Sequence, residues 1–258
     1  MLHTLAGRTI VVTRPEAQAE SLCEAIESRG ARALRFPVLG IAPPEDASAL
    51  EAVSARLDEF DLVFFVSPNA VNFALSYILA RRDWPAGVAV ATVGGGSERA
   101  LRRHGFAHVL APIEGFDSEA VLALPEFASA AIRGKRVLVL RGDGGRELLG
   151  EELTRRGAQV EHASVYRRFC PDANANELLK ADRLDALVLT SSEGVRNLAC
   201  MLGPDALAKL NAVTVFAPHP RIAGSAFDAG FRSVVETDSG DAGIVRGLEA
   251  GLGPVPAA

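Results

Sequence analysis

The chain has 258 residues, of which 48% are hydrophobic and 23% are charged, and its length and composition fit two globular domains of ordinary size. The net charge of −5 argues against a general nucleic-acid-binding protein, which usually carries a basic excess. No apolar run is long enough to span a membrane and the chain starts without an apolar signal core, so we expect a cytoplasmic protein with no nucleic-acid or membrane partner.

Short apolar runs alternate with helical patterns along the chain. In chain order, the predicted strands are 9–13, 33–36, 62–66, 88–93, 108–110, 137–140, 160–163, 186–189, 213–216 and 233–235. The predicted helices are 16–28, 69–80, 97–103, 146–156, 193–202 and 221–229. Several strands are apolar throughout, as is typical of strands buried on both faces. The alternation predicts an α/β fold in which helices flank parallel sheets.

Parts of the sequence occur twice. The matching segments are 7–14 with 134–141, 60–67 with 184–191 and, more weakly, 105–106 with 230–231. The first pair reads Gly-Arg-Thr-Ile-Val-Val-Thr-Arg and Gly-Lys-Arg-Val-Leu-Val-Leu-Arg, and a Gly-Ala pair follows each at the same spacing. Duplicated α/β units predict two similar lobes, and such lobes usually hold a ligand in the cleft between them.

Two short segments interrupt the alternation at corresponding places in the two copies. They are residues 37–44 and 165–171, both extended in character and both ending at proline. We interpret them as linkers between the lobes. One lobe is then discontinuous and comprises residues 1–36 and 171–258, and the other comprises residues 37–170.

Polar residues and glycines follow the predicted strands. The candidate binding residues in these loops are Arg14, Ser67, Asn69, Gly94, Ser97, Arg141, Gly142, Thr190, Ser191, Ser192 and His219. The carboxyl ends of parallel strands are where open α/β sheets bind ligands, and a following helix N-terminus favours anionic oxygens. The same residue types are ordinary helix caps, and the arginines could instead form salt bridges within a lobe. His219 could likewise be a surface loop residue.

Signatures of several other chemistries are missing from the sequence. The glycine runs that begin at Gly94 and Gly142 lack the last glycine of the dinucleotide fingerprint, and no P-loop lysine follows them. The strand-end serines lie outside a Gly-x-Ser-x-Gly elbow, which argues against a hydrolase. We expect no metal site, and we expect Cys23, Cys170 and Cys200 to be buried structural thiols of a reduced compartment.

Several motifs between about residues 7 and 250 resemble, in their order, those of a known family. The motifs are Val12-Thr13-Arg14-Pro15, residues 65–71, Val93-Gly94 with Ser97, Leu140-Arg141-Gly142, Tyr166-Arg167-Arg168, residues 189–194 and residues 218–223. In this order and spacing they are similar to the motifs of uroporphyrinogen-III synthases, which belong to tetrapyrrole biosynthesis.

This resemblance implies two α/β lobes joined by a two-stranded linker, and an enzyme without a metal or organic cofactor. The implied reaction is the cyclisation of hydroxymethylbilane to uroporphyrinogen III, with loss of water and inversion of ring D through a spiro intermediate. It also implies a monomer that takes a small-molecule substrate and makes transient contact with the preceding enzyme of the pathway. The alternative is a non-enzymatic two-lobe module that binds or senses a small molecule.

The resemblance also implies roles for the candidate residues. Tyr166 would assist departure of the terminal hydroxyl, although it could instead pack the hinge. The strand-end hydroxyls and backbone amides would hold the acetate and propionate arms, with Arg14 and Arg141 adding charge. His219 replaces the small hydroxyl residue expected in many relatives. Because a phenol is a weak acid at neutral pH, we expect assistance only from Tyr166.

Overall fold

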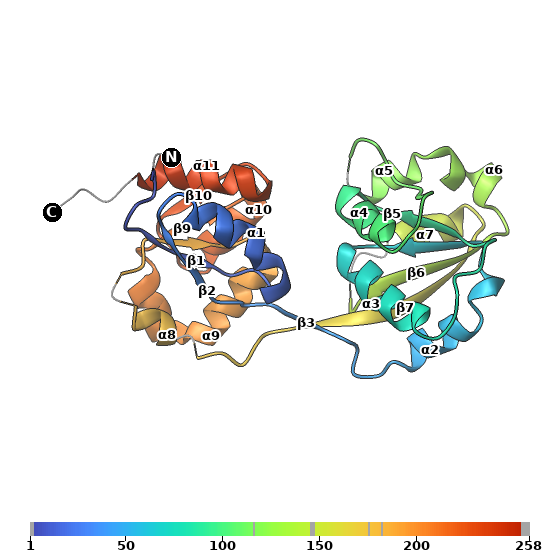
Figure 1. The fold of residues 1–258 in the computed structure, drawn as a ribbon, viewed down its shortest axis with the longest axis horizontal. Helices are drawn as coiled ribbons and strands as arrows, with labels where there is room; N and C mark the ends of the chain where they lie inside the picture. The colour runs from blue at the N-terminus through green and yellow to red at the C-terminus, as the bar shows by residue number, and fades with distance from the viewer. Residues whose placement is uncertain (1–2, 116, 145–147, 175, 182, 254–258) are drawn as a thin grey trace. The chain divides into compact units, whose positions relative to one another are not determined.

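The computed structural model describes residues 3–115, 117–144, 148–174, 176–181 and 183–253. Its contacts divide the chain into unit 1 (Met1–Gly40 with Phe169–Ala258) and unit 2 (Ile41–Arg168). In Figure 1, unit 1 combines the blue start of the chain with its orange and red end. Each unit contains a sheet of parallel strands flanked by helices, which confirms the predicted α/β fold class. A ligand cleft between the two lobes stays a prediction.

Unit 1 is built on a five-stranded sheet with the order β10-β9-β8-β1-β2, in which every neighbouring pair is parallel. Its strands are β1 (Thr9–Val12), β2 (Arg32–Arg35), β8 (Ala186–Val188), β9 (Thr214–Ala217) and β10 (Val234–Glu236). Its helices are α1 (Glu16–Glu27), α8 (Asn176–Leu179), α9 (Ser192–Leu210), α10 (Pro220–Asp228) and α11 (Gly240–Leu252).

Unit 2 repeats this arrangement with a five-stranded sheet of the order β3-β7-β6-β4-β5. Its strands are β3 (Gly40–Ala42), β4 (Leu62–Phe65), β5 (Ala89–Thr92), β6 (Arg136–Gly142) and β7 (Gln159–Phe169). Its helices are α2 (Ser48–Ala55), α3 (Pro68–Leu79), α4 (Gly95–Arg103), α5 (Ser118–Leu122), α6 (Ser129–Ile132) and α7 (Leu148–Arg155), with 3-10 turns η1 (Leu57–Glu59) and η2 (Pro125–Phe127). The pairs from β7 through β5 are parallel.

Helices cover both faces of each sheet. Successive side chains of a strand point to opposite faces, so neighbouring residues pack against different helices. In unit 1, Ile10 packs with α1 and α11, whereas its neighbour Val11 packs with α9 and α10. In unit 2, Phe64 packs with α5, α6 and α7, whereas Phe65 packs with α2, α3 and α4. The apolar runs are therefore central strands, as their composition indicated.

Four strands of each unit share one topology, and each unit takes these strands from both copies of the repeat. β1, β2, β8 and β9 of unit 1 correspond to β6, β7, β4 and β5 of unit 2. Where unit 1 has β10, unit 2 has only a parallel bridge between Leu110 and Ala91. The first copy supplies β1 and β2 to unit 1 but β4 and β5 to unit 2. The second copy supplies the other half of each unit.

An aspartate ties the two halves together at the same place in each unit. In unit 1, the Asp185 carboxylate accepts hydrogen bonds from the Thr9 backbone N–H at 2.9 Å and from Arg8 Nη1 at 2.7 Å. In unit 2, Asp61 accepts from the Arg136 backbone N–H and from Lys135 Nζ, both at 2.8 Å. The Asp185 side chain is only 5% exposed, whereas that of Asp61 is 39% exposed.

Several predictions about elements differ from the structure. Residues 108–110 form the single bridge just described and no strand. The predicted helix 193–202 continues as α9 to Leu210 across a kink, because Gly203 has a φ of 66° and Pro204 follows it. The first residues of the predicted helix 146–156 lie outside the described residues, and α7 covers Leu148–Arg155.

Of the three cysteines that we expected to be buried, only Cys23 is; the prediction is wrong for Cys170 and Cys200, which are exposed. Burial raises the pKa of the Cys23 thiol.

None of the helices that the structure describes is both long and apolar enough to cross a lipid bilayer.

The buried aspartate of unit 1 generates a prediction about stability and pH. Burial would raise the pKa of Asp185, but hydrogen bonds from Thr9, Arg8 and Arg183 outweigh it and hold the pKa below its ordinary value. A carboxylate with a depressed folded-state pKa stabilises the fold above its unfolded pKa of about 3.9 and loses that contribution as the pH falls through the folded value. We therefore expect Asp185→Asn to lower the free energy of unfolding by about 1.5–3 kcal/mol at pH 7.

The measurement is urea unfolding of wild type and Asp185→Asn between pH 3 and 7. The difference in unfolding free energy should shrink below about pH 4, where Asp185 of the unfolded wild-type chain takes up a proton before the folded carboxylate does. Asp61→Asn is the matched variant of unit 2, and its effect should be smaller because water screens the more exposed carboxylate. A pH-independent loss in Asp185→Asn would contradict this account.

Candidate functional site

The parallel strands of each unit end at one edge, and the candidate residues lie at these edges. In unit 2, the neighbouring strands β6, β4 and β5 end at Arg141, Gly142, Ser67, Asn69, Gly94 and Ser97. In unit 1, the neighbouring strands β9, β8 and β1 end at His219, Thr190, Ser191, Ser192 and Arg14. The structure thus brings the candidates together as two sets, one in each unit.

Three of these residues cap the helix that follows their strand. Ser67 Oγ accepts from the backbone N–H of Ala70 at 3.1 Å, and Ser191 Oγ accepts from that of Gly194 at 2.9 Å. His219 Nδ1 accepts from the Arg221 backbone N–H at 3.0 Å. A capping serine can still bind another group, because a hydroxyl that accepts hydrogen bonds still has one proton to donate.

Arg14 forms a salt bridge within its own unit, which was the alternative to a role in binding. Its Nη1 lies 2.6 Å from Asp241 Oδ1, and Asp241 Oδ2 accepts from Ser21 Oγ at 2.5 Å. Burial would raise the pKa of Asp241, but the hydrogen bonds from Ser21 and Arg14 hold it below its ordinary value. The guanidinium at this edge is therefore already matched by a carboxylate. At the start of α9, Ser192 Oγ lies 3.5 Å from the carbonyl oxygen of Arg221.

The glycine run after β5 forms a pocket at the edge of unit 2. Its volume is about 340 Å³, and Pro68, Val93, Gly94–Gly96, Ser97 and Arg99 line it. Gly94 caps α4 with an extended backbone, and the first N–H groups of that helix follow. Those N–H groups have no partner within the helix, so they can donate to an anionic oxygen. The Ser97 side chain is 3% exposed.

Tyr166 lies in the core of unit 2, at the end of β7. Its side chain is 1% exposed and stacks on Phe73, with ring centroids 6.0 Å apart and planes at 26°. β7 is irregular at this point, because Arg141 pairs with Ser164 but the next residue, Gly142, pairs with Tyr166. A Cβ atom on Gly142 would lie 2.5 Å from Cζ of the Tyr166 ring. The ring is therefore packed within unit 2, and the role of Tyr166 in the reaction stays a prediction.

The Tyr166 hydroxyl nevertheless reaches the edge of the sheet. It lies 3.2 Å from Ser67 Oγ, and Arg168 Nη2 donates to it at 3.3 Å. The Arg168 guanidinium carbon also lies 5.7 Å from the centre of the Tyr166 ring. Arg168 belongs to the motif Tyr166-Arg167-Arg168, but the sequence alone predicted no role for it. The signal was available, because residues two apart on a strand point to the same side.

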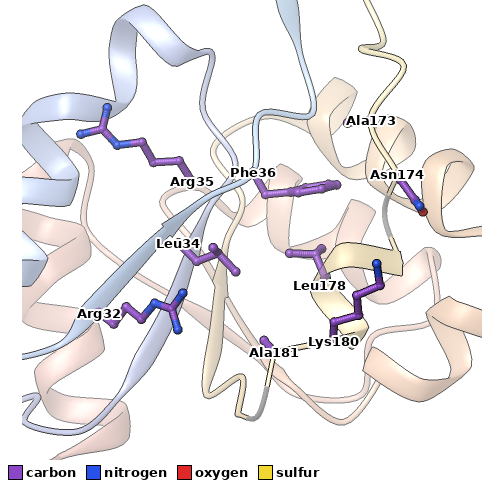
Figure 2. Close-up of a pocket in the computed structure, with 9 residues that line it drawn as sticks. All are labelled: Arg32, Leu34, Arg35, Phe36, Ala173, Asn174, Leu178, Lys180 and Ala181. Carbon is purple, nitrogen blue, oxygen red and sulfur yellow. The ribbon is translucent and has the colours of Figure 1, made fainter.

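A second pocket, in unit 1, lies between the edge strand β2 and a side formed by residues 173–174 and 178–181 (Figure 2). Its volume is about 480 Å³; its lining residues are Arg32, Leu34, Arg35, Phe36, Ala173, Asn174, Leu178, Lys180 and Ala181. None of the candidate residues lines it. Arg35 is already paired with Glu16 at 3.4 Å and with Glu20 at 2.7 Å. Among the described residues, no three His, Cys, Asp or Glu side chains gather as ligands for one metal ion.

Comparisons with known proteins point to a single family. The family described as uroporphyrinogen-III synthase HemD matches residues 20–245. Relatives named uroporphyrinogen-III synthase from Salmonella typhimurium and Escherichia coli K12 are each 36% identical over 194 residues, which cover 74% of this chain and 78% of theirs.

Solved structures with low sequence identity share the fold. The uroporphyrinogen-III synthetase of Helicobacter pylori aligns with a TM-score of 0.61 at 17% identity, covering 95% of this chain and 99% of that one. A mutant uroporphyrinogen III synthase of Thermus thermophilus aligns with a TM-score of 0.59 at 18% identity, covering 95% and 98%.

The contact between Gly142 and Tyr166 generates a prediction. Gly142→Ala should lower the free energy of unfolding by about 1–3 kcal/mol, because the added methyl group overlaps a ring that is packed on its other side. Gly87→Ala is the matched control in the same unit, since a Cβ there meets open space. Urea unfolding of both variants measures the difference. Equal stability of the two variants would show that the Tyr166 ring is free to move aside.

Proposed function

Because the chain belongs to the uroporphyrinogen-III synthase family, we propose that it cyclises hydroxymethylbilane to uroporphyrinogen III, with loss of water and inversion of ring D through a spiro intermediate. The observation that carries this proposal is the family match along residues 20–245. The two polar edges support it, because the substrate is a linear tetrapyrrole whose acetate and propionate arms are anionic.

The carboxylate arms are bound mainly by backbone N–H groups and hydroxyls at both edges. In unit 2, the N-termini of α3 and α4 lie at the ends of adjacent strands, and in unit 1 those of α9 and α10 do. Each helix end adds about 0.3–1 kcal/mol for a carboxylate beside it. Several arms held at once fix the conformation of a flexible chain, and this positioning is the enzyme's main contribution to the rate.

The reaction requires departure of a hydroxyl group and then controlled closure. As the carbon–oxygen bond breaks, its electron pair goes to the oxygen, which leaves as water after taking up one proton. The pyrrole nitrogen supplies the electron pair that stabilises the resulting azafulvene cation. Attack at the substituted carbon of ring D gives the spiro intermediate, whose rearrangement inverts the ring. The ring carbon loses a proton at closure, so the net reaction releases one water.

Roles of single side chains belong to the same proposal. Tyr166 assists the departing hydroxyl, and Ser67, Asn69, Gly94, Ser97, Arg141, Gly142, Thr190, Ser191, Ser192 and His219 bind the arms directly or through their backbone N–H groups. Arg14 adds positive charge, partly offset by Asp241. We further propose a cytoplasmic monomer that needs no cofactor and receives its unstable substrate by transient contact with the preceding enzyme.

The ratio of product isomers tests the proposed function. Hydroxymethylbilane closes without an enzyme to the non-inverted isomer I, so a blank without protein defines the background. We expect the purified protein to give predominantly isomer III, measured by chromatography of the oxidised products. Isomer I at the blank level, from protein with the expected circular dichroism spectrum, would exclude the synthase activity.

A serine of unit 1 tests whether that unit binds the substrate. Ser191→Ala should raise KM about tenfold with a smaller effect on kcat, because one hydroxyl contact to a carboxylate is lost, which corresponds to about 1.4 kcal/mol. Ser28→Ala is the control, since Ser28 caps the opposite end of α1, where its hydroxyl donates to the Ala25 carbonyl. Steady-state formation of isomer III measures both variants. An unchanged KM in Ser191→Ala would remove Ser191 from the binding site.

A further inference from the structure

Three polar side chains of unit 2 form a continuous chain of hydrogen bonds that ends at the polar edge. Arg168 Nη2 donates to Tyr166 Oη at 3.3 Å, Tyr166 Oη lies 3.2 Å from Ser67 Oγ, and Ser67 Oγ accepts from the Ala70 backbone N–H at 3.1 Å. Along this chain, Arg168 is exposed, Tyr166 is buried and Ser67 is half-buried. The buried phenol therefore connects a solvent-exposed cation to a hydroxyl at the end of β4.

The available donors determine which group donates in each of these hydrogen bonds. A guanidinium has donors only, so the Tyr166 oxygen accepts from Arg168 and its single proton points elsewhere. Ser67 Oγ lies within hydrogen-bond distance and has a free lone pair, so it accepts that proton. Both lone pairs of Ser67 are then used, one by Tyr166 and one by Ala70. The proton of Ser67 is left to donate to a group outside the chain.

The opposite direction is unfavourable. If Ser67 donated to Tyr166, the phenol oxygen would accept twice and its own proton would need another acceptor. Tyr166 is 1% exposed, and its ring is enclosed by Phe73 and Gly142. A buried donor without a partner costs about 1–3 kcal/mol. The charge of Arg168 favours the first direction further, because an ionic donor strengthens the hydrogen bonds that follow it.

The corresponding serine of unit 1 stands in different surroundings. Ser191 caps α9 as Ser67 caps α3, and both follow equivalent strands. By the offset that aligns Gly30 with Gly157, the residue that corresponds to Tyr166 is Leu39. A leucine has no hydroxyl to orient the serine. Of the two edges, as far as the described residues go, only that of unit 2 therefore has a serine whose proton is directed outward by a neighbouring phenol.

We propose that Arg168 is a positioning residue for the reaction, acting through Tyr166 on Ser67, and that Ser67 donates its hydrogen bond to the departing hydroxyl of the substrate. The inference rests on the proposed function. It adds that the Ser67 hydroxyl contacts the end of the bilane that carries the departing hydroxyl. A leaving hydroxyl needs a donor, whereas a carboxylate arm can use any N–H group of a helix end. Ser67 donates without losing its proton, and the proton that completes the water comes from solvent.

The test is the steady-state rate of isomer III formation by variants of the three hydrogen-bonded residues. We expect Tyr166→Phe and Arg168→Ala each to lower kcat about tenfold and to leave KM within twofold of wild type. Arg168→Lys should recover part of the loss, because an ammonium also donates to a phenol. In the Tyr166→Phe background, Arg168→Ala should lower kcat no further, since the phenol through which Arg168 acts is already gone. Ser67→Ala should lower kcat at least as much as Tyr166→Phe.

Matched controls separate this role from structural damage and from direct binding. Arg167→Ala removes the neighbouring arginine, which pairs with Glu45 at 3.6 Å, and it should retain wild-type kcat. Thermal unfolding of each variant shows whether the fold is kept. A raised KM with unchanged kcat in Arg168→Ala would mean that Arg168 binds a substrate arm directly.

The remaining outcomes distinguish the two proposals from each other. Multiplying losses in the double variant would show that Arg168 acts independently of Tyr166 and would overturn the inference. Wild-type isomer III formation with unchanged kinetics in Arg168→Ala would overturn the role of Arg168 alone. No isomer III from the folded wild type would overturn the proposed function and this inference together.

Discussion

The central strand pair of each unit joins segments that are far apart in the sequence, and the rest of the structure depends on that pairing. β1 pairs with β8 in unit 1, and β6 pairs with β4 in unit 2. At the start of each pair, an aspartate accepts the first backbone N–H of the facing strand, Asp185 from Thr9 and Asp61 from Arg136. Because each pair combines both copies of the repeat, neither copy can complete a sheet within its own residues.

Parallel pairing supports the proposal that this acidic protein binds a polyanion. The chain carries a net charge of −5, and Arg14 at the edge of unit 1 is paired with Asp241. The parallel direction places the start of each following helix at the same edge, so backbone N–H groups replace basic side chains as donors. Such donors are held rigidly by the helices. In the proposed complex, they fix the positions of the anionic arms as well as attracting them.

Much of this arrangement was predictable because its causes are local. Apolar runs such as 62–66 and 186–189 are central strands, and the glycines after the helices, Gly30 and Gly157, have φ values of 86° and 94° that favour glycine. The strand-end residues were found for the same reason, since alternating strands and helices imply parallel sheets and parallel sheets gather their loops.

What sequence reasoning missed depends on partners that are distant in the chain. Helix α11 contains four glycines, which lower helix propensity. Two of these, Gly247 and Gly251, lie where a Cβ would meet Thr237 at 2.3 Å and Phe216 at 2.9 Å, so they are needed for close packing against the sheet. The Asp241 partner of Arg14 and the Gly142 contact that encloses Tyr166 are long-range in the same way. No local pattern identifies them.

The difference between the two edges suggests how a duplicated fold can serve a reaction with an asymmetric substrate. The backbone is shared, and a cap serine stands at Ser67 and at Ser191. At the position that corresponds to Leu39, unit 2 has Tyr166, whose hydroxyl lies 3.2 Å from Ser67 Oγ. A weak donor of this kind suffices, because hydroxymethylbilane closes even without an enzyme. A stronger acid would hasten departure of the hydroxyl without favouring the inverted product. In the proposed mechanism, the selectivity therefore comes from the way the arms are held, and chemical assistance at one end of the substrate can remain modest.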